Sequence, residues 1–412
     1  MSNAFRTILP VFWLLAESLG IAFLVKYTRT GSLLRTLGFP CVAVAGYFIY
    51  TSSLTFSNSV IYNGSFAMTY FLPLVHSINL LFLNPIDAQH APGISIGLNV
   101  RGIATPWLAK NTPEFPSYYG GRRPERFAFL LRQTAIVIWQ YLAIDLFATA
   151  GSLQTPEEVQ MLQGPGLEFA YLSATKEQWI ARISTSLVAT FIMSRIMIDI
   201  VARFSSIIFV GLGLSNPSEW RPLFNSMWDA YTLRNYWGKF WHQLLRWPFT
   251  SISNYLTRRI LHLPPHSLLE RYLNVLIVFS LSGLMHVSFL AATGISTLDY
   301  WRGSMLYFTS FTLGFMIEDA AQALWQRLGV EGSQPISKGM MVFKRVVGML
   351  WVLTFLCMTS PIFGYPLGRV PAERREMIPT GYSVAKVVGL GPVLGTVGVG
   401  ALFLKFLFGA RL

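Results

Sequence analysis

Apolar residues gather in nine long runs along the chain, separated by more polar connections. Each run approaches the roughly 20 residues that an α-helix needs to cross a bilayer. The pattern predicts an all-α, polytopic membrane protein with about eight or nine transmembrane helices, of which the second and third are the least apolar. The first run has no evident cleavage site, so we expect it to be retained as a helix. The expected spans are 8–25, 39–55, 66–83, 128–150, 184–211, 271–293, 303–324, 343–363 and 385–408.

The composition supports the same class of protein. Of the 412 residues, 53% are hydrophobic and only 12% are charged, whereas a soluble domain carries about 25% charged residues. Too few ionisable groups are present to cover a water-facing surface, so much of the surface must face lipid. We expect one polytopic membrane domain over residues 1–412, with a group of N-terminal helices in 1–150.

The charge is strongly positive, with 32 Lys and Arg against 19 Asp and Glu and a net charge of +13. The basic residues lie between the apolar runs and form no long block, which favours membrane topology and headgroup contacts over nucleic-acid binding. The connections alternate between more basic and less basic. By the positive-inside rule, nine helices place the N-terminus in the lumen and the C-terminus in the cytosol.

Two connections on the basic side are too long to be simple turns. Residues 84–127 are rich in Pro and Gly and contain Arg122, Arg123 and Arg126. Residues 212–270 combine aromatic, basic and helix-forming residues. Long ordered connections in compact proteins are usually functional, so we expect functional residues there.

Charged residues also occur inside the fifth predicted span. Arg195, Asp199 and Arg203 follow one another at intervals of four residues. This spacing places them on one face of a helix, where their charges can neutralise each other.

His286 is the strongest candidate for chemistry. It lies well inside the sixth span, in the stretch Ser282-Gly-Leu-Met-His286. An ionisable side chain at that depth is costly and marks a functional site by default, and histidine is suited to proton transfer because its unperturbed pKa is about 6.5. Gly283 would allow close approach of a neighbouring helix or ligand. From the residues alone, a buried histidine bonded to another helix is an equally good interpretation.

A second candidate is the segment Tyr231-Thr-Leu-Arg-Asn-Tyr-Trp-Gly-Lys-Phe-Trp-His-Gln243. On a regular helix, one face would hold Arg234, Trp237 and Trp241, and another would hold Asn235, Lys239 and His242. Such an amphipathic helix prefers the membrane interface. The pattern fits either a simple interfacial anchor or a helix at the mouth of a reaction chamber.

No pattern in the chain indicates a metal centre. The two cysteines, Cys41 and Cys357, lie singly in apolar runs, and the histidines and acids have no HxxxH or HExxH spacing. We therefore expect no metal site and no bound cofactor.

Together, the segment Leu233–Gln243 and the stretch Ser282–His286 resemble the wax synthase-like branch of the membrane-bound O-acyltransferase superfamily. Within that branch they are most similar to fungal enzymes that acetylate terpenoid and meroterpenoid alcohols in secondary metabolism. The stretch Asn216-Pro-Ser-Glu-Trp-Arg-Pro222 is also typical of that group. The resemblance rests on motifs in the C-terminal half, with a catalytic region at about 212–330, and on hydropathy before it.

The resemblance implies specific roles. His286 would be the general base, and the Phe-Trp-Gly-x-x-Trp core of the family falls on Tyr236-Trp237-Gly238-x-x-Trp241. Plant wax synthases and sterol acyltransferases have Asn after the second Trp, whereas this chain has His242. His242 and Asn235 are therefore both candidates for the group that stabilises the oxyanion.

The resemblance also implies substrates and a location. Acetyl-CoA would be the co-substrate, entering from the cytosolic side, where the arginine-rich connections meet its phosphates. Arg234, Trp237, Lys239 and Trp241 would bind the donor, and the apolar alcohol would arrive laterally from the lipid of the endoplasmic reticulum.

Two other interpretations compete with this one. A long-chain acyl-CoA donor would make the protein a wax-ester or sterol-ester synthase. A membrane transporter is the alternative from a different class, although no internal repeat supports it. The sequence sets neither the acceptor alcohol nor the oligomeric state.

Overall fold

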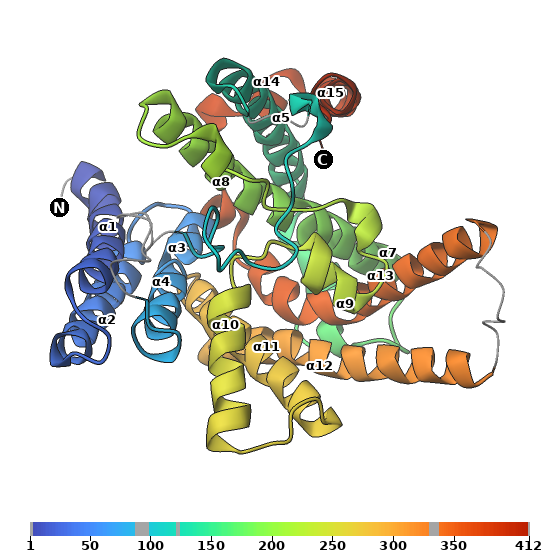
Figure 1. The fold of residues 1–412 in the computed structure, drawn as a ribbon. Helices are drawn as coiled ribbons and strands as arrows, with labels where there is room; N and C mark the ends of the chain where they lie inside the picture. Colours follow the sequence, from blue (N-terminus) through green and yellow to red (C-terminus); the bar gives the residue numbers. More distant parts are fainter. Residues whose placement is uncertain (1–2, 87–98, 121–123, 329–337, 411–412) are drawn as a thin grey trace. The chain divides into compact units, whose positions relative to one another are not determined.

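The computed structural model describes residues 3–86, 99–120, 124–328 and 338–410. Within these ranges the chain forms helices joined by turns and loops (Figure 1). Arg122 and Arg123, at the end of the first long connection, lie outside the described residues. The chain divides into two compact units, one of residues 1–109 and 243–324 and the other of residues 110–242 and 325–412.

Eight helical segments in the described ranges are long and apolar enough to cross a membrane, which confirms the predicted class of a polytopic helical membrane protein. The seventh predicted span, 303–324, lies within the 31-residue helix α12 (Thr297–Arg327), which is not among the eight. The ninth, 385–408, is broken at Gly389 into α14 (Val384–Val388) and α15 (Leu390–Phe408). The backbone of Gly389 has φ of +89°, which is outside the helical range.

The first unit contains the N-terminal helices and the pair α11 and α12. Helices α1 and α2 lie side by side (Figure 1). The long connection 243–270 supplies α10 and the π-helical segment that continues it. The helices of this unit are α1 (Asn3–Tyr27), α2 (Leu33–Ser53), α3 (Val60–Ala67), α4 (Phe71–Ile78), the π-helical turn Asn79–Leu83, α10 (Arg246–Asn254), the π-helical segment Tyr255–Ile260, α11 (Leu268–Ala291) and α12 as far as Leu324.

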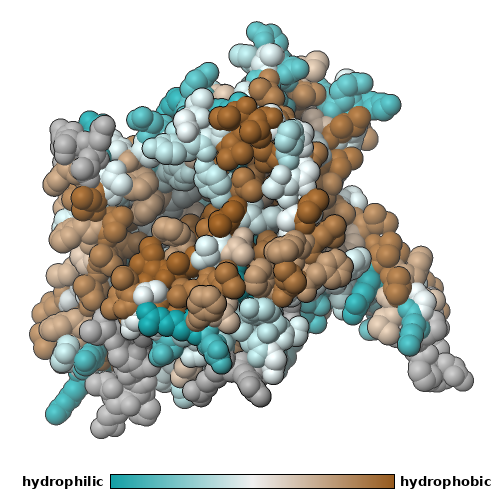
Figure 2. Space-filling model, turned by 90° about the horizontal axis from the view of Figure 1, so that it is seen from above, coloured by the Kyte–Doolittle hydropathy of each residue, from teal (hydrophilic) through white to brown (hydrophobic). Residues whose placement is uncertain are grey.

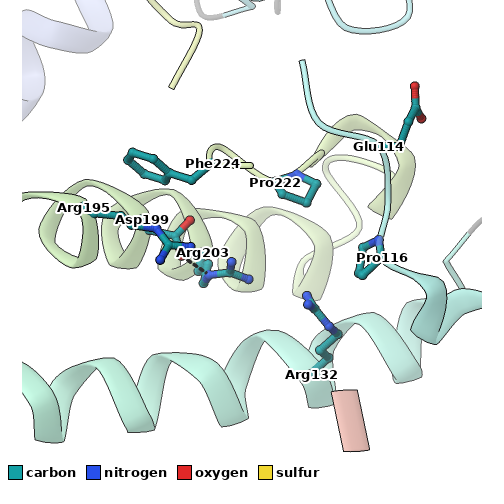
Figure 3. A pocket seen from close by; sticks show the side chains of 8 residues that line it. All are labelled: Glu114, Pro116, Arg132, Arg195, Asp199, Arg203, Pro222 and Phe224. Atoms are coloured by element: carbon teal, nitrogen blue, oxygen red, sulfur yellow. Dashed lines mark hydrogen bonds and ion pairs between the residues drawn. The ribbon is translucent and has the colours of Figure 1, made fainter. Parts of the chain in front are cut away.

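The second unit is built around α5 and α8. Their buried faces are joined by polar bonds: Gln140 Nε2 of α5 donates to Asp199 Oδ2 of α8 over 2.8 Å, and Arg203 Nη1 of α8 donates to Gln133 Oε1 of α5. Within α8, Arg203 Nε lies 2.5 Å from the same Asp199 oxygen (Figure 3). The predicted neutralisation between Arg203 and Asp199 is thus confirmed. The helices of this unit are α5 (Arg126–Ser152), α6 (Pro156–Gln163), α7 (Lys176–Thr185), the π-helical segment Ser186–Met193, α8 (Ser194–Gly211), α9 (Leu233–Asn235), the π-helical turn Tyr236–Phe240, α13 (Lys338–Gly368), α14 and α15.

Hydrophobic side chains cover much of the surface in view in Figure 2. On α13, Phe343 is 55% exposed and Leu350 is 60% exposed, and on α15 Phe406 is 81% exposed. Contiguous apolar surface on this scale is unfavourable in water and favourable in hydrocarbon. The chain is therefore an integral membrane protein.

A buried arginine holds the N-terminal helices together. Arg35 of α2 is 1% exposed, and its Nη2 donates to the carbonyls of Thr28 (3.0 Å) and Ile86 (2.8 Å). These carbonyls lie in loops that follow α1 and the third span. Buried backbone carbonyls need a hydrogen-bond donor, and the Arg35 guanidinium supplies it for carbonyls just after two membrane segments.

We expect Arg35→Met to destabilise the protein by about 2 kcal/mol or more, because it leaves these carbonyls without their donor. Thermal unfolding of the purified protein, followed by fluorescence-detected size exclusion, should show a midpoint lowered by a few degrees. Arg29→Met, at an exposed position nearby, is the matched control. Equal midpoints for the two variants would contradict this role of Arg35.

Candidate functional site

His286 lies on α11, and its tautomer is set by its own helix. Its Nδ1 is 2.7 Å from the carbonyl oxygen of Ser282, one turn earlier. A carbonyl can only accept, so Nδ1 carries the proton and Nε2 carries the lone pair. The side chain is half-buried. The imidazole is thus held in the form that can take a proton at Nε2.

The ring of His286 is also oriented by α12. It stacks on Phe308, with ring centroids 4.2 Å apart and planes inclined by 29°. The two helices approach closely beside it: Ser304 Oγ donates to the Gly283 carbonyl over 2.6 Å, and a Cβ at Gly283 would lie 2.9 Å from Met305 Sδ. A larger residue at 283 would require the Met305 side chain to move, in agreement with the close approach predicted there.

Helix α3 packs against the part of α11 that follows His286. A Cβ at Gly64 would lie 2.7 Å from the carbonyl oxygen of Phe289. Nearby, the hydroxyls of Tyr70 and Ser288 are 3.2 Å apart. His286 therefore lies on a stretch of helix that is fixed by neighbours on both sides, which suits a catalytic group that must keep one orientation.

The second candidate segment differs from the expected amphipathic helix. Thr232 caps α9 by accepting from the Asn235 N–H over 3.0 Å. The chain then widens into a π-helical turn, in which the Trp241 N–H donates to the Tyr236 carbonyl, and it becomes extended at Trp241. The grouping of residues by helical face is therefore wrong here, because that grouping assumed a regular α-helix extending to His242.

Two asparagines hold this π-helical turn in place. Asn111 Nδ2 donates to the Gly238 carbonyl over 2.6 Å, and Asn225 Nδ2 donates to the Lys239 carbonyl over 2.9 Å. The Asn225 N–H also donates to the Phe240 carbonyl over 3.2 Å. Sequence reasoning missed both asparagines, because an asparagine in a loop gives no local indication of which distant carbonyls it will bind.

Stacked rings surround the segment. Tyr236 is 1% exposed and lies nearly parallel to Trp241, with centroids 5.5 Å apart, and Trp237 meets Trp241 edge-on at 5.6 Å. His242 lies against Trp241 at 5.6 Å and against Phe224 at 5.8 Å. The structure thus brings Trp237, Trp241 and His242 together in one aromatic cluster.

The remaining predicted residues are more accessible. Lys239 is exposed, while Arg234 and Asn235 are half-buried beside the capped end of α9. These residues and His242 belong to the second unit, whereas His286 belongs to the first. Within the part of the chain that the structure describes, no group of three or more His, Cys, Asp or Glu residues is arranged to hold a metal ion.

The described helices form an integral membrane protein in which His286 lies within an apolar, membrane-length helix. Residues 220–310 match the membrane bound O-acyl transferase family. No solved structure matches the chain. The matched range contains both candidate segments, Tyr236–His242 and Ser282–His286.

The chain is similar over nearly its whole length to fungal proteins named as acetyltransferases. It is 39% identical to acetyltransferase atnC of Arthrinium sp over 95% of this chain and 94% of that protein. It is 35% identical to acetyltransferase pyr8 of Aspergillus fumigatus, over 91% and 90%, and 35% identical to acetyltransferase cdmC of Talaromyces verruculosus, over 96% and 97%. The chain belongs to the membrane bound O-acyl transferase family and is an acyltransferase.

We expect Asn225→Asp to loosen the π-helical turn, because a carboxylate oxygen would replace the amide that donates to the Lys239 carbonyl. The loss of this solvent-accessible hydrogen bond should cost about 0.5–1.5 kcal/mol. Hydrogen exchange followed by mass spectrometry should show faster exchange in peptides covering residues 236–242. Asn58→Asp, at an exposed position, is the control, and unchanged exchange in Asn225→Asp would refute the assignment.

Proposed function

We propose that this protein transfers an acetyl group from acetyl-CoA to the hydroxyl of an apolar terpenoid or meroterpenoid alcohol, with His286 as the general base. The observation that carries the proposal is the bond from His286 Nδ1–H to the Ser282 carbonyl, which leaves Nε2 as the basic nitrogen. The relatives that are named acetyltransferases support acetyl as the group transferred. The acceptor class follows from the resemblance of the motifs to fungal terpenoid acetyltransferases.

In the proposed reaction, His286 Nε2 accepts the proton of the acceptor hydroxyl while the hydroxyl oxygen attacks the thioester carbonyl. The tetrahedral intermediate collapses as a new C–O ester bond forms and the C–S bond breaks. The imidazolium returns its proton to the CoA thiolate, so the histidine ends as it began. Nδ1–H stays bonded to Ser282 throughout, which prevents the ring from turning its basic nitrogen away.

The motif suggests two candidates for the second catalytic group, which stabilises the oxyanion. We propose His242 or Asn235 as the donor that stabilises the oxyanion, and Arg234, Trp237, Lys239 and Trp241 as residues that bind the donor. Support comes from the fixed backbone of this segment, since a positioned donor stabilises the transition state without reorganising. His242 is the better held of the two, because it lies between the rings of Phe224 and Trp241.

We also propose that the protein resides in the endoplasmic reticulum, with its N-terminus in the lumen and its C-terminus in the cytosol, an orientation that requires α12 to cross the membrane in addition to the eight apolar segments. The proposal rests on the family and on the more basic connections that share one side. Acyl-CoA is a cytosolic co-substrate, so its entry from that side is consistent with this orientation.

The proposal predicts that yeast microsomes containing the protein form labelled ester from labelled acetyl-CoA and a terpenoid alcohol. His286→Ala should lower the rate at least a hundredfold, because general base catalysis contributes about 10²–10⁴. The control is His262→Asn, since His262 is an exposed loop residue with φ of +49° that asparagine tolerates. It should keep the wild-type rate at matched protein levels.

Other outcomes would change the proposal in defined ways. Equal product from wild type and His286→Ala would remove the histidine from the mechanism. Ester from palmitoyl-CoA but not from acetyl-CoA would indicate a wax-ester or sterol-ester synthase. Absence of ester from both donors would contradict the proposed transfer to a terpenoid alcohol.

A separate prediction concerns the oxyanion. Of His242→Ala and Asn235→Ala, only one should lower kcat by about a hundredfold, since removal of one oxyanion donor costs 10²–10³ in rate. The rates should be measured with saturating acetyl-CoA, so that a loss of donor affinity does not mask the result. If neither substitution lowers kcat tenfold, the oxyanion is stabilised by a group outside this pair.

A further inference from the structure

The proposed reaction gives His286 a positive charge for part of each turnover, because its imidazole takes the proton of the acceptor hydroxyl. Its neighbours along α11 are apolar, with Leu284 and Met285 before it and Val287 after it, in a helix long enough to cross the membrane. A charge in such surroundings is costly unless nearby groups stabilise it. The groups that contact the ring therefore affect how readily the charged intermediate forms.

One of these contacts lies at the edge of the imidazole. The Ser282 carbonyl oxygen is 2.7 Å from Nδ1 and accepts its proton. This hydrogen bond becomes stronger when the ring is charged, because a cationic donor makes a stronger bond than a neutral one. The carbonyl carries only a partial charge, whereas the imidazolium carries a full one, so a second stabilising contact would lower the barrier further.

The second contact lies on the face of the imidazole. The ring of Phe308 is stacked on it, with centroids 4.2 Å apart and planes inclined by 29°. The face of a benzene ring carries the negative part of its quadrupole, so it attracts a cation placed over it. Two neutral rings gain less from facing each other directly. The arrangement therefore favours the charged form of the histidine.

The packing of α11 against α12 holds the two rings together. Phe308 is 4% exposed, and the attraction between a cation and a ring is strongest when water is excluded. One turn earlier on α12, Ser304 Oγ donates to the Gly283 carbonyl over 2.6 Å. Because Gly283 is three residues before His286, this bond fixes the register of the two helices next to the ring pair.

We infer that Phe308 stabilises the imidazolium form of His286 during acetyl transfer, through the attraction between the positive charge and the face of its ring. The inference rests on the proposed function, because His286 becomes charged in the reaction only if it acts as the base. Phe308 is thus a positioning residue that acts through the histidine. A carboxylate in its place would add a second buried charge, whereas a phenylalanine ring needs no compensation in an apolar helix pair.

The test alters the charge distribution of the Phe308 ring and keeps its size nearly constant. Stop-codon suppression introduces 4-fluoro-, 3,5-difluoro- or 3,4,5-trifluorophenylalanine at position 308, since each fluorine withdraws electron density from the ring face. Single-turnover rates are measured in microsomes with labelled acetyl-CoA and the terpenoid alcohol that the wild type acetylates fastest. We expect the maximal rate to fall stepwise, by about tenfold at the trifluoro ring. The acetyl-CoA concentration that gives half the maximal rate should stay unchanged, because the charge forms only after binding.

Phe311 provides the matched control. It lies on the same helix, is 0% exposed, and stacks on Phe279 of α11 with centroids 5.2 Å apart. No charge forms in this pair of phenylalanines during the reaction, so the same three fluorinated residues at position 311 should keep the wild-type rate. Phe308→Leu, which removes the ring and keeps an apolar side chain, should lower the rate at least as much as the trifluoro ring.

The outcomes distinguish this inference from the proposed function. If His286→Ala abolishes the reaction but the rate is constant along the series at position 308, the inference is wrong and the histidine remains the base. A loss in Phe308→Leu beside a constant series would mean that the ring only packs against the histidine, and equal losses at positions 308 and 311 would assign the effect to fluorine in the core. Both results would overturn the inference. A wild-type rate in His286→Ala would reject the proposed function and the inference together.

Discussion

Every buried backbone carbonyl and N–H in this protein needs a partner within the protein, because the surrounding hydrocarbon offers none. Helices meet this requirement except at their ends and irregular turns. At those points the chain uses polar side chains: the buried Arg35 binds the carbonyls after two membrane segments, and the half-buried Asn111 and Asn225 bind the carbonyls of the π-helical turn. The positions of these few side chains decide where the backbone can leave the regular helix.

The two candidate segments show two ways in which this constraint produces a site. On α11 the helix stays regular, and the Ser282 carbonyl accepts a second bond, from His286 Nδ1. Between Asn235 and Trp241 the helix opens and ends, and its carbonyls are bound by asparagines from other loops. In both cases the backbone bond positions a side chain that is proposed to act in acyl transfer.

Much of the fold could be predicted from local pattern. The sixth predicted span, 271–293, corresponds to α11 at Leu268–Ala291, and the polar bond between Asp199 and Arg203 followed from their spacing. Prediction was poorer where the backbone is irregular. The break at Gly389 and the π-helical turn at Tyr236–Phe240 both lie in sequence that reads as helix, because hydropathy reports burial and does not report which bonds the backbone makes.

The sequence by itself determined that the chain is a helical membrane protein, that His286 lies within a membrane helix, and which motifs place it among the O-acyltransferases. These properties depend on composition, run length and local order, which need no knowledge of distant neighbours. Only the tertiary structure decided the tautomer and stacking of His286 and the asparagine supports of the π-helical turn. Each of these joins atoms on different elements or fixes a side-chain torsion, and such contacts are set by packing in three dimensions.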